Sequence, residues 1–169
     1  MDARLLFHSL TPSLFHNKES AVRIYLDTCC LNRPFDEQAE EKVILETEAI
    51  LGIIDRCETT NDWFFFSSDV LDDEISQMVH PVKKEKVLAL YQSASAHIPL
   101  NDEIIRQAEM REWLVLRPFD SLHLACAEFA QADVLLTTDK KFIRQAKQLK
   151  LKTRVANPLV WLMEVMDEC

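Results

Sequence analysis

Glycine is almost absent from this sequence, because Gly52 is the only one among 169 residues. The Gly-rich loops that hold dinucleotides or nucleoside triphosphates need at least two glycines at set spacings. Rossmann-type dinucleotide binding and P-loop chemistry are therefore excluded. C-x-x-C pairs are also missing, and Cys29 and Cys30 are adjacent. We expect reduced thiols, and neither a disulfide framework nor a structural zinc site.

Long apolar runs are missing as well. No stretch approaches the roughly 18 apolar residues that a membrane span requires, and His8, Pro12 and His16 interrupt the N-terminal apolar stretch, which makes it a poor secretory signal. Hydrophobic residues form 48% of the chain and charged residues 28%, as in ordinary globular domains. We expect an N-terminal extension, residues 1–21, and one folded domain, residues 22–169, in a cytoplasmic protein without membrane contact.

The net charge of −9 argues at first against a nucleic-acid partner. The charges are unevenly distributed, however. Every charged residue from Lys140 to Arg154 is basic, whereas the charged residues from Asp36 to Glu48 are acidic except Lys42. The chain could therefore present one basic flank to a polyanion, although a solvated charged helix has the same pattern.

Apolar patterning predicts strands that alternate with helices. The expected strands are residues 22–27, 63–67, 134–138 and 153–156. The expected helices are residues 40–58, 120–131, 139–149 and 159–166, with others starting at 68 or 69, 81 and 101. Such alternation implies a three-layer α/β/α fold around a central, mainly parallel sheet of four or five strands.

Acidic residues stand where such a sheet would bring them together. Asp27 ends the first strand, Asp139 ends the strand 134–138, and Asp120 begins the helix leading into that strand. Ligands bind at the edge where parallel strands end and the next helices begin. Glu74, about one and a half turns into a helix, can reach the same edge. Crowded carboxylates repel one another without a cation, and oxygen ligands suit Mg²⁺ or Mn²⁺, so we expect phosphodiester hydrolysis.

Each of these acids also has an ordinary structural explanation. Asp120 and Asp139 stand where helix N-caps belong, and Asp27 could be a turn residue. The choice of Glu74 is open too, because other acids are near it in sequence or equally placed. The competitors for the position of fourth ligand are Asp72, Asp73, Glu46 and Glu48.

The segments around the four acids resemble the motif blocks of PIN domains. The PIN start, an apolar strand ending in Asp-Thr, resembles RIYLDTCCLNRPFD, and the second block resembles SSDVLDDEI, which aligns its glutamate with Glu74. The third and fourth blocks resemble FDSLHLACAE, with Asp120, and LLTTDKKF, with Asp139 and the Thr137 hydroxyl. The closing segment of one PIN subgroup is similar to ANPLVW, so the resemblance covers about 22–161.

The resemblance implies a Mg²⁺- or Mn²⁺-dependent ribonuclease whose catalytic residues and metal ligands are Asp27, Glu74, Asp120 and Asp139. VapC-type toxins of toxin–antitoxin pairs belong to this family, which adds an antitoxin protein and a second copy of the chain to RNA as implied partners. Residues 1–20 and the long helix 40–58 depart from the compact toxins. These departures bear on the toxin role and not on the fold.

Three residues near the acids are expected to meet the substrate. They are Thr137, Arg33 in the loop after Asp27, and Lys140 beside Asp139; Arg33 could equally form a loop salt bridge. His123, one turn after Asp120, could face the site, but a buried and hydrogen-bonded histidine is the commoner outcome. The aromatic run 63–66 is expected in the core and not as a base-stacking surface.

Other function classes fit the sequence less well. A haloacid-dehalogenase-like phosphatase needs a second aspartate two positions after Asp27, where Cys29 stands. A phospho-receiver domain needs an acidic pair beside the first strand, which Arg23 and Tyr25 do not supply. The remaining alternative is a catalytically inactive PIN-like domain that binds RNA or a protein.

Overall fold

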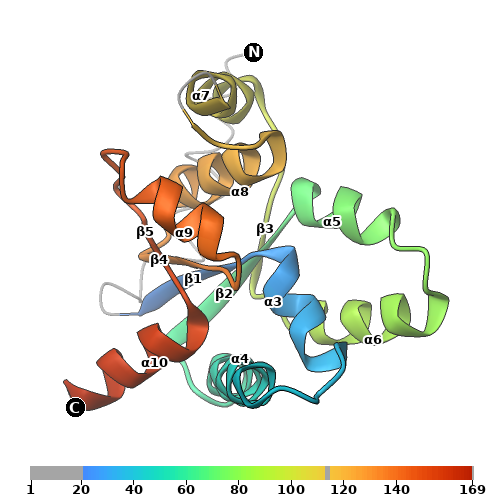
Figure 1. The fold of residues 1–169 in the computed structure, drawn as a ribbon. Helices are drawn as coiled ribbons and strands as arrows, with labels where there is room; N and C mark the ends of the chain where they lie inside the picture. Colours follow the sequence, from blue (N-terminus) through green and yellow to red (C-terminus); the bar gives the residue numbers. More distant parts are fainter. Residues whose placement is uncertain (1–20, 113–114, 169) are drawn as a thin grey trace.

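The computed structural model describes residues 21–112 and 115–168 (Figure 1), so the expected extension 1–21 lies, but for Ala21, outside the described residues. The strands are β1 (Val22–Leu26), β2 (Trp63–Ser68), β3 (Ala96–Ile98), β4 (Val134–Leu136) and β5 (Arg154–Ala156). The helices are α3 (Thr28–Asn32), the 3₁₀ helix η1 (Arg33–Phe35), α4 (Glu41–Thr59), α5 (Asp69–Ser76), α6 (Pro81–Tyr91), α7 (Asp102–Glu112), α8 (Pro118–Phe129), α9 (Lys140–Ala146) and α10 (Pro158–Asp167).

The strands form one sheet in the order β3-β2-β1-β4-β5, and every neighbouring pair is parallel. β1 lies at the centre, with Val22 opposite Trp63 of β2 and Ile24 opposite Val134 of β4. Helices α8 and α9 lie on one side of the sheet, and α4 and α10 lie on the other (Figure 1). The expected three-layer α/β/α fold is confirmed.

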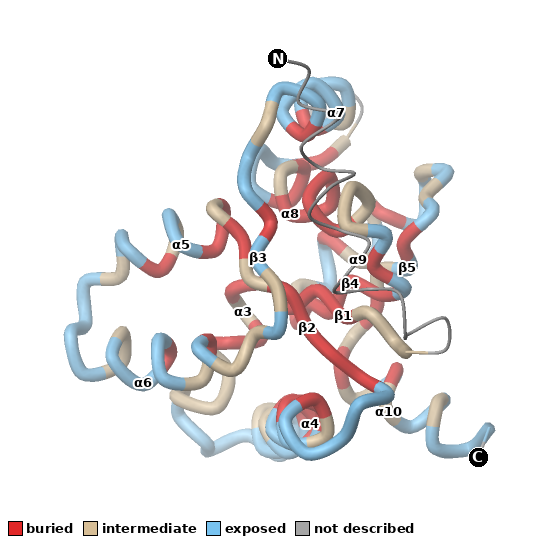
Figure 2. Tube along the Cα trace, turned by 180° about the vertical axis from the view of Figure 1, so that it is seen from behind, coloured by how far each residue is buried: buried red, intermediate tan, exposed pale blue. Residues whose placement is uncertain are grey.

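The central strands are the buried core of the molecule (Figure 2). Ile24, Tyr25 and Leu26 of β1 have no exposed surface. The rings of Trp63 and Trp161 lie 5.0 Å apart between β2 and α10. Burying one large apolar side chain contributes about 1.5–3 kcal/mol, so the aromatic run of β2 stabilises the core, as the sequence predicted.

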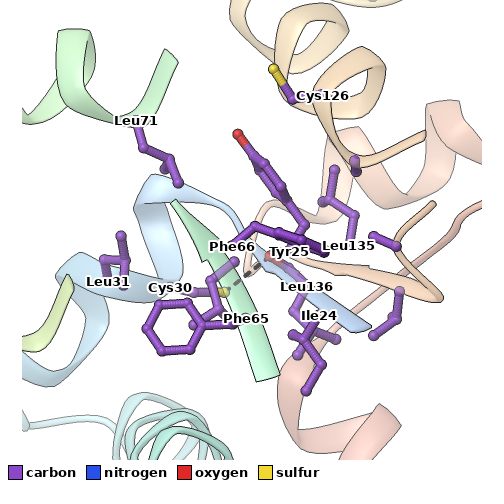
Figure 3. Packing of buried hydrophobic residues seen from close by; sticks show 14 of the residues in the cluster. Ile24, Tyr25, Cys30, Leu31, Phe65, Phe66, Leu71, Cys126, Leu135 and Leu136 are labelled. Atoms are coloured by element: carbon purple, nitrogen blue, oxygen red, sulfur yellow. Dashed lines mark hydrogen bonds between the residues drawn. The ribbon is translucent and has the colours of Figure 1, made fainter. Parts of the chain in front are cut away.

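The described cysteines are free thiols, as expected. Cys30, Cys57 and Cys126 are buried, and Cys29 is partly exposed. The thiol of Cys30 on α3 donates to the Leu136 carbonyl oxygen of β4 at 3.3 Å (Figure 3). Burial raises the pKa of the Cys126 thiol to about 12. The buried thiols therefore act as small core side chains.

Side-chain caps begin several helices at residues that the sequence indicated. Ser68 Oγ accepts from the Leu71 amide at 3.2 Å at the start of α5, and Asn101 Oδ1 accepts from the Ile104 amide at 2.9 Å before α7. Such bonds satisfy amide groups that the first helical turn leaves without a partner. None of the helices within residues 21–112 and 115–168 is long and apolar enough to cross a membrane.

Two elements differ from the expectation. β3 has three residues, with a polar His97 at its centre, too few for an alternating pattern. It is added to the sheet edge by pairing with β2, beside the bond from the Ser95 amide to the Phe65 carbonyl at 2.9 Å. A loop was expected after Asp27, but residues 28–32 form α3, because burial of Cys30 and Leu31 outweighs weak helix propensity.

Candidate metal centre

Asp27 follows β1 directly, and its amide donates to the Leu136 carbonyl of β4 at 3.0 Å. Its side chain does not cap α3. Instead, Oδ2 accepts from the Thr137 hydroxyl at 2.7 Å and from the Cys29 thiol at 3.2 Å. Thr137 therefore orients the Asp27 carboxylate at the end of the neighbouring strand, beside the acidic group as the sequence indicated.

Glu74 lies on α5 and turns toward Asp27. Its Oε2 meets His123 Nε2 at 2.7 Å and accepts from the Thr28 hydroxyl. His123 Nε2 is also 3.5 Å from Asp27 Oδ1. One ligand atom from each of Asp27, Glu74 and His123 lies within 4.8 Å of the others. Side chains from β1, α5 and α8 thus meet at one point on the strand-end edge.

His123 is buried beneath the carboxylates and is held on both ring nitrogens. Nδ1 meets the Tyr25 hydroxyl at 2.8 Å, and that hydroxyl meets Ser68 Oγ at 2.8 Å. Burial alone lowers the pKa of His123, but the bond to Glu74 and the negative charges of Asp27 and Asp120 outweigh it and raise the pKa. The imidazolium form can donate from both nitrogens, so it suits this position.

The same pair determines the charge of Glu74. Burial alone raises the pKa of Glu74, but the hydrogen bonds from His123 and Thr28 outweigh burial and lower the pKa below its ordinary value. The hydrogen bonds therefore favour the charged carboxylate form of Glu74. A carboxylate with these partners keeps its negative charge, which a metal ligand requires.

Asp120 and Asp139 form the second half of the group, joined by Arg117. Arg117 Nε lies 2.9 Å from Asp120 Oδ2, and its Nη2 pairs with Asp139 Oδ2. Asp139 also caps α9, since its Oδ1 accepts from the Lys141 and Phe142 amides at 2.7 and 3.1 Å. The structural expectation for Asp139, a helix cap, is therefore confirmed.

The two halves influence each other electrostatically. Burial raises the pKa of Asp120, and Asp27 and Asp139 raise it further, against the lowering effect of Arg117. Burial also raises the pKa of Asp139, but the amide bonds of the cap and Arg117 outweigh it and lower the pKa. A carboxyl whose pKa is raised by neighbouring carboxylates, as that of Asp120 is, is the kind of group that a divalent cation stabilises in its charged form.

The competing acids lie elsewhere. Asp72 Oδ1 accepts from the Tyr91 hydroxyl at 2.7 Å, and Asp73 Oδ2 accepts from the side-chain amide of Gln77 at 2.9 Å. Glu46 is fully buried on α4, and Glu48 on the same helix is exposed. Only the glutamate favoured by the sequence, Glu74, points at Asp27 among these described acids.

Glu46 forms a separate charged group with Arg33. Arg33 Nε lies 3.0 Å from Glu46 Oε2, and Lys42 Nζ lies 3.1 Å from Oε1 of the same carboxylate. Arg33 Nη1 also lies 3.2 Å from Asp36 Oδ2. The structure thus places Arg33 in ion pairs, the alternative considered for it. Lys140 is exposed at the start of α9, beside Asp139.

Sequence reasoning missed Arg117 and Thr28. Arg117 stands three residues before Asp120, a spacing that favours pairing at the start of a helix. The sequence could therefore have indicated the contact between Arg117 and Asp120. Its contact with Asp139 joins residues 22 positions apart. That contact depends on how α8 packs against β4, which spacing does not show.

The donor set fits a hard divalent cation. The four carboxylates of Asp27, Glu74, Asp120 and Asp139 supply oxygen atoms, and Asp27 and Asp120 are 7% and 8% exposed. Mg²⁺ and Mn²⁺ prefer carboxylate oxygens and complete their coordination with water and phosphate. His123 pairs with Glu74, and Arg117 pairs with Asp120 and Asp139. The residues present therefore suit such an ion.

The chain is similar to known proteins in two comparisons. The PIN domain family matches residues 24–148. The crystal structure of PAE2754 from Pyrobaculum aerophilum is 17% identical, with a TM-score of 0.47, and the match covers 86% of this chain and 94% of that one. No curated protein matches the chain significantly. Because the family match spans most of the sequence and the fold agrees with it, the chain belongs to the PIN domain family.

Proposed function

We propose that this PIN domain protein is a divalent-metal-dependent ribonuclease that hydrolyses RNA phosphodiester bonds. The observation that supports the proposal is that Asp27 and Glu74 converge on His123 while Asp120 and Asp139 share Arg117, and that the negative charge of Asp27 raises the pKa of Asp120. A purely structural role would not favour grouping these carboxylates, because their mutual repulsion destabilises the fold.

The four acids would hold Mg²⁺ or Mn²⁺, with Thr137 and Thr28 orienting Asp27 and Glu74 through their hydroxyl groups. When bound, a divalent ion lowers the pKa of its water and offsets negative charge on the leaving oxygen. His123 keeps Glu74 turned toward Asp27 through the 2.7 Å contact at Nε2. Tyr25, below it, prevents the imidazole from rotating away.

The RNA would approach along the basic flank beside Asp139. Lys140 is exposed at the first turn of α9, and the basic residues up to Arg154 follow it. Lysines at such positions make phosphate contacts that orient a nucleic acid without reading its sequence. Arg33, on the other side of Asp27, would act through its charge, since its guanidinium is engaged with Glu46 and Asp36.

The test is cleavage of labelled single-stranded RNA in Mn²⁺ by the wild type, Asp120→Asn and Asp139→Asn. We expect metal-dependent cleavage that falls by about a hundredfold or more in both variants, because each loses a charged ligand of the site. Asp55→Asn, an exposed acid on α4, is the matched control and should cleave like the wild type. Equal activity in all proteins would exclude the proposed site.

A second candidate is a PIN-like domain that binds RNA or a protein without catalysis. The observation that favours it is that His123 and Arg117 already neutralise part of the acidic group without an ion. This candidate predicts RNA binding without cleavage in Mn²⁺, so the same assay decides between the two. Metal binding by the wild type that is lost in Asp120→Asn favours the ribonuclease.

The finer biological role that we propose is a cytoplasmic toxin of a toxin–antitoxin pair, silenced by an antitoxin protein and active as a homodimer. Induced expression should arrest bacterial growth, and Asp120→Asn should restore it. A growth arrest that persists in the Asp120→Asn variant would contradict this role and leave the ribonuclease proposal to the cleavage assay. The size of the purified protein in solution tests the homodimer.

A further inference from the structure

A pocket of about 520 Å³ opens between α3, η1 and the link from α5 to α6, next to the acidic group. Helix α3 packs against α6 on the side of the molecule away from α8 (Figure 1). Ligand pockets typically enclose about 300–1,000 Å³. The volume is therefore within the range of pockets that bind a ligand of the size of one nucleotide.

The pocket lies next to the candidate metal centre. Cys29 and Thr138 line it, and Cys29 Sγ lies 3.2 Å from both Asp27 Oδ2 and Thr137 Oγ1. The Thr138 amide donates to the same sulfur at 3.2 Å. The Cys29 side chain therefore lies between the pocket and the Asp27 carboxylate that would hold the ion.

The floor of the pocket carries a positive charge in a protein that is otherwise acidic. Lys83 Nζ lies 2.7 Å from Asp36 Oδ1, and Arg33 pairs with Asp36 and Glu46. Lys42 completes this connected group at Glu46. Of these residues, Arg33, Lys83 and Asp36 line the pocket, so two basic side chains face one acidic one, which leaves one net positive charge. The positive charge of Lys83 and Arg33 would attract the phosphate next to the scissile bond.

The outer wall of the pocket is apolar. Met78 and Val79 line it from the link between α5 and α6, and Val79 is 84% exposed. An isolated aliphatic side chain on the surface is ordinary, but here it stands over a charged floor. A ribose or base can pack against the aliphatic wall while its phosphate meets Lys83, so the pocket matches both parts of a nucleotide.

We propose that this pocket binds the nucleotide adjacent to the scissile phosphodiester of the RNA. The inference rests on the proposed ribonuclease function and extends it, because it assigns a binding surface to the nucleotide next to the cleaved bond. Lys83 is the phosphate contact, and Val79 is the contact to the base or ribose.

The test is fluorescence anisotropy with a labelled single-stranded RNA in EDTA, where binding is measured without cleavage. Lys83→Ala should raise the Kd by roughly tenfold, the loss of one charge-assisted contact. It should also reduce the slope of log Kd against log salt by about 0.7, as one lost phosphate contact on a single strand does. Val79→Trp, which fills the mouth of the pocket, should raise the Kd without changing that slope.

Matched controls are available on the same helix. Lys84 and Val82 lie on α6 outside the pocket lining, and Val82 is 65% exposed. Lys84→Ala and Val82→Trp should bind RNA as the wild type does. Lys83→Ala is matched by Lys84→Ala, and Val79→Trp by Val82→Trp. A loss of folding or of overall charge should weaken RNA binding by both variants of a pair, whereas a lost pocket contact should weaken binding by the pocket variant alone.

Equal affinities within the matched pairs, or an unchanged salt slope in Lys83→Ala, would overturn the pocket proposal even if the wild type cleaves RNA in Mn²⁺. Weaker binding of the pocket variants in a protein that never cleaves RNA would support the pocket and contradict the ribonuclease.

Discussion

Arg117→Gln should tighten the binding of Mn²⁺. The Arg117 guanidinium stands between Asp120 and Asp139, and its side chain is 51% exposed. For a divalent ion to use these carboxylates, the guanidinium must leave them. The substitution removes the competing cation and keeps a side chain of similar length. The same contacts raise the pKa of Arg117, first through Asp120 and then through Asp139, so the guanidinium stays charged and competes at every working pH.

The expected change follows from the two ion pairs that the metal displaces. Exposed pairs are each worth about 0.2–1 kcal/mol. Displacing two such pairs makes the free energy of Mn²⁺ binding less favourable by about 0.5–2 kcal/mol in the wild type. Because Arg117→Gln removes both pairs, the Kd for Mn²⁺ should fall by about 2- to 30-fold in this variant. Asp120 is 11% exposed at its side chain and Asp139 30%, so the upper half of this range applies at low salt. Added salt should narrow the difference, because it screens the pairs in the wild type.

Isothermal titration calorimetry or the Mn²⁺ electron paramagnetic resonance signal measures this affinity directly. Arg154→Gln is the control, because Arg154 is 53% exposed and also pairs with a carboxylate, Glu164, away from the acidic group. Its Mn²⁺ affinity should equal that of the wild type. An unchanged or weaker affinity in Arg117→Gln would refute the reasoning, because the guanidinium would then assist the ion or be irrelevant to it.

Two further predictions concern the buried charges. Glu46→Gln should lower the free energy of unfolding by about 3 kcal/mol in a denaturant titration, because it leaves Arg33 without its buried partner. The exposed control Glu48→Gln should change the free energy of unfolding by less than about 0.5 kcal/mol. Equal midpoints for the two variants would contradict this prediction. The pKa of His123 is raised by Glu74 and Asp27 against burial, so its protonation stabilises the metal-free fold fully below the ordinary value of 6.5. That contribution is lost as the pH rises through the raised pKa, so the free energy of unfolding in EDTA should decline there in the wild type and not in His123→Gln; a parallel profile in both proteins would rule it out.

The sequence predicted the parts of the fold that repeat a simple pattern. Apolar strands ending in Asp27 and before Asp139 were recognisable because buried parallel strands are continuously apolar. β3 was missed because three residues with His97 at the centre contain no such pattern, and only pairing with β2 makes them a strand. Helix α3 was missed because tertiary burial of Leu31 outweighs the local preference of its sequence.

The acids of the candidate site were predictable from the same logic, since strand ends and helix starts share one edge of a parallel sheet. The charges between them were not. Arg117 reaches Asp139 across 22 residues, and His123 reaches Glu74 across 49. Such contacts depend on how α8 is rotated against the sheet, which periodicity leaves open.

Asp139 serves two elements with one side chain, since Oδ1 caps α9 and Oδ2 faces Arg117. Truncation to alanine would fray the helix that displays Lys140 while it empties the acidic cluster, so a lost activity could not be traced to either cause. Asparagine is nearly as good a cap as aspartate. Asp139→Asn would therefore remove a charged ligand of the proposed metal site while it keeps the cap of α9. A cation bound at Asp139 should in turn affect the first turn of this basic helix.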